Sequence, residues 1–508
     1  MIRQPNKRLK KFVSSSAILP YLAPAYRNAA LAALTLLTAC TVPKPAPIAE
    51  YDPPPPLSRH AYQAQNRPPA PDTSSSPTED AGIDTQQTYD LPALVDLALH
   101  THPETRISWE EAKAAAARLE RNRSNWYPTL TVMAFGQHFT SSFPIPGSAL
   151  VSNGYAAFAS LDLAWTLFDF GRREALVDAG TQRLSAANFA FDRKHQEIAY
   201  RVASSFFAYQ AALAKVTAAQ QTFESAKTNA DSVQAKLKQG LATKPDLLLA
   251  LQEQAKSSYD LQDARGSVTQ TRADLTTSLG ISPAYSLQLV DLSKLPLPAE
   301  LAQSVEKIVD QALEQRPDLL ARLAELRARE ADVKKARAEF WPKVSLRGMV
   351  GNQYWGNVHT KPSGGESYSA NTMVDTAMLN VEWTLFDGFE RSNAVREAEA
   401  KRSASQAQLE ALRLEIMRDI WKAYADTKTA LEKREFALAL LKAAEESYAA
   451  TQESYTHGFS TVIELLSAQK DLARARYTEI DSRATLLRSA ATLVYVSGEQ
   501  NPEVLDEH

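Results

Sequence analysis

The sequence predicts a mainly α-helical chain with membrane β-strands, formed by one unit that occurs twice. Residues 161–176 read LDLAWTLFDFGRREAL and residues 379–394 read LNVEWTLFDGFERSNA, an alignment at a spacing of 218. Before the shared Phe-Asp pair, apolar and polar residues alternate, which is the period of a strand with two unlike faces. About 72 residues without proline then follow in each copy. At about 1.5 Å per residue this segment predicts a helix roughly 100 Å long.

The duplication extends over most of the chain. Gly240 in KQGLATKPDLL returns as Gly458 in THGFSTVIELL, again 218 residues later. Two upstream proline pairs are spaced by 214 residues: Pro103 with Pro317, and Pro128 with Pro342. The change from 214 to 218 places a four-residue insertion in a loop, where length is tolerated.

The amino terminus has the pattern of an export signal. Basic residues precede the apolar run AALAALTLLTA, which ends at Cys40, the only cysteine of the chain. Leu37-Thr38-Ala39-Cys40 resembles the bacterial lipoprotein box, which implies removal of residues 1–39 and a covalent lipid on Cys40. A buried helix with a chance cysteine is the alternative. Thr41 follows the cysteine instead of the aspartate typical of inner-membrane retention, so we expect export to the outer membrane.

Residues 40–88 form the next segment, a lipid anchor followed by a tether. The segment contains PKPAP, DPPPP, RPPAP and SSSPTED, and no periodic apolar pattern. Such composition cannot bury a core and is typical of an extended, flexible linker.

The two repeats are expected at residues 89–290 and 291–500, with a short tail at 501–508. In the first repeat, a helix at 92–126 interrupted near Pro103 leads into a strand at 129–139. In the second, the matching strand covers 344–355. The loops of the two hairpins are expected at 142–154 and 356–372, which are rich in Pro, Gly, Ser and Asn.

A long descending helix and a shorter returning one complete each repeat. The first turns at Gly240 and returns over 241–279; the second turns at Gly458. Near each turn, residues spaced three and four apart predict coiled-coil packing of the arms. These residues are Phe223, Ala226, Ala230, Val233 and Leu237, and Leu441, Ala444, Tyr448, Thr451 and Tyr455.

Four strands per chain are too few to close a barrel, which needs about eight or more. Two chains would supply eight strands, which side chains fill, and three chains would supply twelve, which leave a passage. In such a barrel Leu161, Leu163 and Trp165 would face lipid and Asp162 the interior. A soluble sandwich with the same apolar rows as its core is the alternative.

Composition excludes several other functions. The net charge of −3 gives no basic field for nucleic acid. The eight histidines are scattered, and HExxH, GxSxG and phosphate-loop patterns are missing from the sequence. We therefore expect no enzyme activity, no metal site, and no cofactor other than the lipid on Cys40.

Residues 90–500 resemble the TolC family of outer membrane factors, through the duplicated helix–hairpin–helix unit, the WxLFD stretches and the GLATxxDLL tip. The resemblance implies a trimeric 12-stranded β-barrel continued by a long α-helical coiled-coil barrel in the periplasm. It also implies a passive duct that exports drugs or other toxic small molecules across the outer membrane. The implied partners are two further copies of the chain, outer membrane lipid, a periplasmic adaptor protein and an inner-membrane pump.

The resemblance assigns roles to both tips. Gly240-Leu241 matches the adaptor-docking motif, with Gly458-Phe459 as its second copy. A glycine there also serves as a helix C-cap, and both roles are compatible.

The same resemblance places the periplasmic gate at Asp246, Glu464 and Tyr455. A ring of such carboxylates would titrate with raised, coupled pKa values. The alternative is an acid in the first helical turn, stabilised by the helix dipole. Ser460 and Ser467 stand where some members carry a gate arginine and a second aspartate.

Two other functions remain open from the sequence. One is a duct for protein secretion, and the other is a lipid-anchored periplasmic coiled-coil scaffold without a pore. The amphipathic hairpins favour a duct, because a scaffold has no need of strands that face lipid.

Overall fold

The computed structural model describes residues 87–498, except 291–296, 298–300, 302 and 362–366. All of these residues fall within one compact unit of the chain, residues 55–508. The expected signal segment 1–39, Cys40, nearly all of the tether and the tail 501–508 lie outside the described residues.

Four long strands form one antiparallel sheet in the order β2-β3-β5-β6. Their bounds are β2 Thr129–Ile145, β3 Ser148–Phe168, β5 Lys343–Lys361 and β6 Tyr368–Glu382. The two hairpins have the same register: Thr129 pairs with Ala164 and Lys343 with Glu382, at the spacings of 214 and 218 found in the sequence. The duplication therefore sets the strand pairing as well as the order of the elements.

The first hairpin corrects the expected loop at 142–154. Both strands continue through this segment, and the chain reverses between Ile145 and Ser148. Gly147 lies in this turn at φ 81°, a conformation that glycine adopts at little cost. Serine and asparagine were misleading here, because a strand that faces water on one side accepts them.

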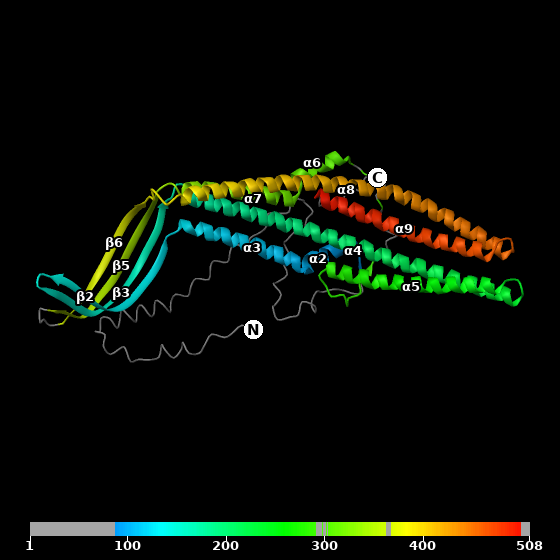
Figure 1. Cartoon of the computed structure of the whole chain (residues 1–508), viewed down its shortest axis with the longest axis horizontal. Helices are drawn as coiled ribbons and strands as arrows, with labels where there is room; N and C mark the ends of the chain where they lie inside the picture. Colours follow the sequence, from blue (N-terminus) through cyan, green and yellow to red (C-terminus); the bar gives the residue numbers. More distant parts are fainter. Residues whose placement is uncertain (1–86, 291–296, 298–300, 302, 362–366, 499–508) are drawn as a thin grey trace. The chain divides into compact units, whose positions relative to one another are not determined.

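Two helices of 67 residues dominate the helical part, α4 Arg172–Lys238 and α8 Glu390–Thr456. The expected helix of about 72 residues is thus confirmed with slightly later starts. Each turns at its tip into a returning helix, α5 Lys244–Ser278 or α9 Val462–Ser497 (Figure 1). Among the helices of the described part, none combines the length and apolar character needed to cross a membrane.

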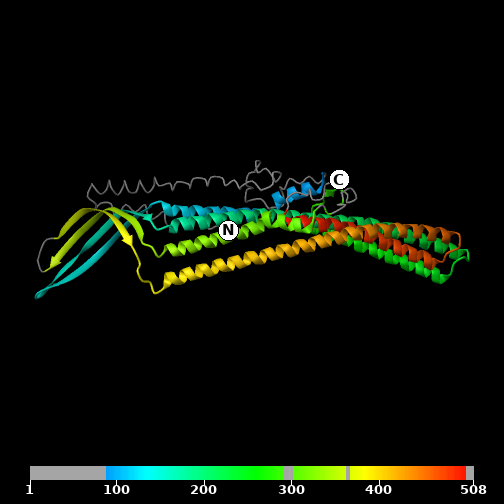
Figure 2. The same cartoon turned by 90° about the horizontal axis from the view of Figure 1, so that it is seen from above.

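Shorter helices fill the space between the sheet and the returning arms. They are α2 Leu91–Thr101, α3 Pro103–Arg123, α6 Val305–Gln315 and α7 Pro317–Ala338. With 11 and 21 residues, α2 and α3 together with the 35 of α5 match the length of α4. Near the sheet, neighbouring helices contact one another in the order α3-α4-α7-α8. Toward the tips, the order of contacting helices is α5-α4-α9-α8 (Figure 2).

Small residues allow this close helix packing. Ala226, Ala230 and Val233 of the predicted spacing on α4 are all buried, as are Ala444 and Tyr455 on α8. Alanine faces let helix axes approach closely, so the core is a thin seam between helices.

The repeated WxLFD stretch forms the corner at which strand becomes helix. The Asp169 carboxylate binds the guanidinium of Arg173 at 3.1 Å, and this guanidinium also donates to the carbonyl of Thr166 at 2.7 Å. The Trp165 indole donates to the carbonyl of Trp126 at 2.9 Å. The Trp126 ring lies 4.2 Å below the same guanidinium.

The second corner repeats the carboxylate and indole contacts at the equivalent positions. The Asp387 carboxylate binds Arg391 at 2.5 Å, and the Trp383 indole donates to the carbonyl of Phe340 at 3.1 Å. In each repeat, the stretch thus connects the end of the hairpin to the start of the long helix and to the segment that precedes the hairpin.

The returning helices end against the starts of α3 and α7. Gly280 and Gly498 both have positive φ, 73° and 77°. A Cβ at Gly280 would lie 2.7 Å from His102 Cα, and one at Gly498 would lie 2.5 Å from Arg316 Cγ. The Arg316 guanidinium donates to the Val496 carbonyl at 2.7 Å and so caps the end of α9.

Candidate functional site

Both tips are closed by the same C-cap geometry. Gly240 at φ 74° follows α4, with its amide bonded to the Leu237 carbonyl and the Leu241 amide bonded to the Lys236 carbonyl. This pair of bonds is the Schellman motif. Gly458, at φ 82°, has the same pair of bonds at the end of α8.

The residues after the two glycines point into solvent. Leu241 is 73% exposed and Phe459 is 88% exposed. A cap normally brings such an apolar residue back against its helix. Each tip of the chain therefore carries one large, exposed apolar side chain at the equivalent position.

Both tip carboxylates belong to capping boxes at the starts of the returning helices. Asp246 accepts from the Thr243 amide at 2.9 Å and from its hydroxyl at 2.6 Å. Glu464 accepts from the Thr461 amide at 2.8 Å and from the Ser460 hydroxyl at 2.6 Å. Ser460, which is expected from the family resemblance to stand at a gate position, thus holds Glu464 in place.

These bonds lower the pKa of both carboxyl groups. For Asp246 the causes are the hydroxyl and then the backbone amide of Thr243; for Glu464 the hydroxyl of Ser460 comes first. A ring of like charges would raise the pKa of these carboxyl groups, so the lowering seen in the single chain has the opposite direction. Such a ring requires several copies of the chain, whereas the caps exist within one.

Tyr455 is buried at the junction of the two helical hairpins. It packs among Val233, Leu247 and Leu465, which come from both repeats. Burial, and then the charge of Asp246, raise the pKa of its phenol. Among the residues that the structure describes, none forms a hydrogen bond with this hydroxyl.

Lys236 on α4 holds this tyrosine from the other hairpin. Its ammonium lies 3.7 Å from the centre of the Tyr455 ring and donates to the Tyr455 carbonyl at 2.9 Å. Deeper between the hairpins, the Asn229 amide donates to the Gln469 oxygen at 2.7 Å. Lys470 and Glu253 form an ion pair at 3.1 Å across the same junction. The sequence analysis missed these residues, since contacts between the hairpins leave no local signal.

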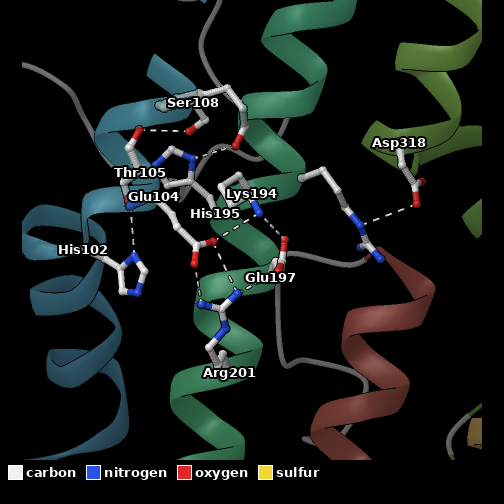
Figure 3. Close-up of polar contacts among 11 residues, drawn as sticks. His102, Glu104, Thr105, Ser108, Lys194, His195, Glu197, Arg201 and Asp318 are labelled. Atoms are coloured by element: carbon white, nitrogen blue, oxygen red, sulfur yellow. Dashed lines mark hydrogen bonds and ion pairs between the residues drawn. The ribbon is translucent and has the colours of Figure 1, made fainter. Parts of the chain in front are cut away.

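A second polar cluster joins α3 to α4 midway along the chain's helical part (Figure 3). Glu104 accepts from Arg201 at 2.8 Å and from Lys194 at 3.3 Å, and both cations also bind Glu197. The bond from Arg201 is the main reason that the pKa of Glu104 falls to about 2. Nearby, Arg193 reaches Asp318 of the second repeat at 3.5 Å.

These charges form structural pairs. Within the described ranges, no group of three or more His, Cys, Asp or Glu residues is arranged to hold a metal ion. Charges that face one another across helices are typical of a supporting network.

Comparison with known proteins identifies the family. A family model described as outer membrane efflux protein matches residues 94–281 and 308–499. The chain belongs to the outer membrane efflux protein family. Each matched segment lies within one of the two expected repeats, and the predicted family is confirmed.

Individual relatives agree with this membership. The chain is 29% identical to protein CyaE of Bordetella pertussis, over 82% of this chain and 85% of the relative. It is 26% identical to outer membrane protein OprJ of Pseudomonas aeruginosa, over 75% of this chain and 78% of the relative. A membrane protein from Pseudomonas aeruginosa of known structure superposes with a TM-score of 0.69 at 23% identity, covering 86% of this chain and 99% of that one. The predicted fold is confirmed.

Proposed function

We propose that three copies of this outer membrane efflux protein form a passive duct that carries small toxic molecules out of the cell. The observation that carries the proposal is the open sheet. Within the described residues, β2 and β6 each have a neighbouring strand on one side only. Unpaired edges of 17 and 15 residues invite another chain.

Three copies fit the strand number best. Four strands from one chain cannot surround a space, and eight enclose only side chains. Twelve strands leave an aqueous bore, and the helices that continue from β3 and β6 would extend its wall. The helical layer would close in the same way. Its edges in the described residues are α3 and α5 on one side and α8 on the other, and each edge would contact the opposite edge of the next copy.

The exposed side chains suit a barrel in a bilayer. Leu130 and Val132 on β2, and Leu379 and Val381 on β6, are exposed apolar residues on alternate positions. A lipid environment removes the cost of exposing such rows. Trp341, exposed near the corner between strand and helix, is of the type that lies at a membrane interface.

The remaining roles of the duct follow from the family resemblance. A lipid on Cys40 anchors the chain to the outer membrane. Gly240-Leu241 and Gly458-Phe459 receive a periplasmic adaptor, which connects the duct to an inner-membrane pump. Asp246, Glu464 and Tyr455 lie around the closed periplasmic end, and the exposed apolar tips support the docking role.

Planar bilayer recording tests this function. The purified assembly is expected to give discrete conductance, and the conductance of the double variant D246N/E464Q is expected to be less selective for cations because negative charge near the mouth is removed. Absence of conductance from both proteins would favour a scaffold without a pore. Sensitivity of a deletion strain to toxic small molecules, with protein export unchanged, separates efflux from a secretion duct.

A further inference from the structure

The sheet gathers aromatic rings on the face that carries Asp162, the face expected inside the duct. On β3, Phe158 lies four residues before Asp162 and therefore shares its face. Phe135 of β2 lies opposite Phe158, and the centres of the two rings are 5.4 Å apart. Farther along the same face, Phe139 of β2 and Trp355 of β5 meet edge to face, with ring centres 5.2 Å apart. The ring patch consists of these four aromatic residues: Phe135, Phe139, Phe158 and Trp355.

The second hairpin indicates that the fold does not require these rings. The duplication matches three residues of the ring patch with residues that are not aromatic: Phe135 with Met349, Phe139 with Gln353, and Phe158 with Thr376. Both hairpins nevertheless have the same pairing of their strands, because the pair of Phe135 with Phe158 corresponds to the pair of Met349 with Thr376. A role other than strand pairing therefore accounts for the rings of the first hairpin.

Rings from different copies would not cover one another in a barrel of twelve strands. With strands about 4.8 Å apart and tilted by about 40°, such a barrel is about 75 Å around and about 24 Å across. Side chains of two facing sheets meet when the sheets are about 10 Å apart. The wall opposite the ring patch is too distant for such contact, so the molecule that meets the rings is one that passes through the bore.

We propose that the ring patch binds planar aromatic molecules inside the duct. The proposal rests on the proposed function and names a class of molecule for it. Aromatic rings attract one another through offset stacking and edge contacts, and their faces also attract cations. Phe135 is 47% exposed, so much of its ring is open to such a partner.

The surroundings of the ring patch favour stacking over ion pairing. The flanking positions on the same face of the described strands are uncharged: Met133, Gln137, Ser160, Gln353 and Thr372. The carboxylate of Asp162 belongs to a residue four positions from Phe158, which is about 13 Å along the strand. An aliphatic ion therefore has no partner of opposite charge among the described residues beside the rings, whereas a planar aromatic molecule can stack on them.

Block of the ionic current tests the class of ligand. Ethidium is a planar aromatic cation, and tetrapropylammonium is a cation of the same charge without rings. In a planar bilayer, ethidium should reversibly interrupt the current through the purified assembly at a concentration about 10-fold below that needed for tetrapropylammonium. Equal blocking concentrations would overturn the proposal, as would block by maltohexaose at a lower concentration than by ethidium.

The second hairpin supplies the substitutions for a matched variant. F135M/F139Q/F158T takes the residues found at the equivalent positions, so it should retain the conductance and require about 10-fold more ethidium for half block. Y155M is the control, because Tyr155 is an exposed ring on the opposite face of β3 and its equivalent is Met373. This control should be blocked like wild type. If the triple variant does not conduct, F158T alone should require about 3-fold more ethidium; variants blocked like wild type would overturn the assignment.

Photolabelling separates this inference from the proposed function. Ethidium monoazide, irradiated together with the purified assembly, should label peptides that contain residues 135–139 or 158, and an excess of ethidium should prevent the labelling. Conductance without label in these peptides would overturn the ring patch and leave the duct in place. Label in these peptides without conductance would overturn the duct and retain the ring patch as a binding surface.

Discussion

Lys236 and Tyr455 join the tip of one helical hairpin to the tip of the other. The ammonium of Lys236 lies 3.7 Å from the centre of the Tyr455 ring and also binds its carbonyl. A partly desolvated cation–π contact contributes on the order of 1–2 kcal/mol. This contact, together with Asn229 and Gln469, holds the hairpins in one relative position.

K236M is expected to loosen the tips. Spin labels at Gln239 and His457, exposed residues at equivalent positions, report the distance between them. We expect a narrow distance distribution for the otherwise wild-type protein and a broader one for K236M. K238M, which removes an exposed lysine from the same turn, is the control and should match wild type. Equal distributions for the two variants would show that Lys236 does not hold the hairpins together.

The exposed apolar tips should be needed for efflux and not for assembly. L241D and F459D each place a charge on the proposed docking surface, and we expect the double variant to lose at least 10-fold in its support of resistance to toxic compounds. Trimeric mass and single-channel conductance should remain unchanged. Q239D adds the same charge to an exposed neighbouring residue without removing an apolar side chain, and should retain most activity. Loss of the trimer in L241D/F459D would count against a docking role.

The corner salt bridges should differ in their importance for stability. Arg173 is buried and its partner Asp169 is largely covered, with 7% and 11% of their side chains exposed, and Arg173 also binds the carbonyls of Thr166 and Leu167. Removing one partner of a buried pair typically costs about 3–5 kcal/mol. R173M should therefore lower the free energy of unfolding by about 3 kcal/mol.

The second corner provides the comparison for this prediction. Its Arg391 binds Asp387 and, at 3.4 Å, the carbonyl of Glu339, with its pair slightly more exposed. R391M should have a smaller effect than R173M in denaturant unfolding of the detergent-solubilised protein. The reverse order would show that carbonyl contacts do not decide the strength of the corner.

The Glu104 cluster should make stability depend on pH in the acid range. The pKa of the Glu104 carboxyl is about 2 in the folded chain, compared with its ordinary value of 4.5. The folded state therefore binds fewer protons at this group than the unfolded state does. The stabilisation is present above about pH 4.5 and is lost as the pH falls toward 2. Because Glu104 is about one-third exposed, solvent screening limits the effect to about 1 kcal/mol.

E104Q tests this dependence. The variant should be less stable than wild type at pH 7, and the difference should shrink between pH 4.5 and pH 2 and with added salt. E110Q, which changes an exposed carboxylate on the same helix, should show a smaller difference at pH 7. A difference for E104Q that does not vary with pH would assign its effect to packing.

Two measurements distinguish a helix-capping role of Asp246 from a role in the periplasmic gate. In D246N, the bonds from Thr243 should weaken because an amide oxygen is a weaker acceptor than a carboxylate, and hydrogen exchange in the first turn of α5 should increase. If Asp246 also lies in a ring around the duct, D246N should lower the cation selectivity of the conductance as well. T243V removes the hydroxyl and retains the carboxylate, so it should weaken the cap without the change in charge. Equal cation selectivity of the two variants and wild type would leave Asp246 as a cap alone.

The duplicated spacing in the sequence was enough to predict the repeats, the long helices and the hairpins. It succeeded because the Trp165 and Trp383 stretches, and the glycines at 240 and 458, occupy positions where geometry restricts the residue type. The expected loop at 142–154 was wrong, since polar residues are compatible with a strand exposed to water. Arg173 and Arg391 were missed, although their common spacing from Asp169 and Asp387 was visible.

The candidate site was harder to predict than the fold. The capping box of Thr243 and Asp246 has a recognisable local spacing, so its role could be weighed from sequence. The contact of Lys236 with Tyr455 joins residues 219 positions apart, and no local pattern connects them.

The mass of the detergent-solubilised protein tests the central claim most directly. Native mass spectrometry of the purified mature protein should give three times the mass of one chain, in an assembly that requires detergent to remain in solution. A monomer that stays soluble without detergent would contradict the duct.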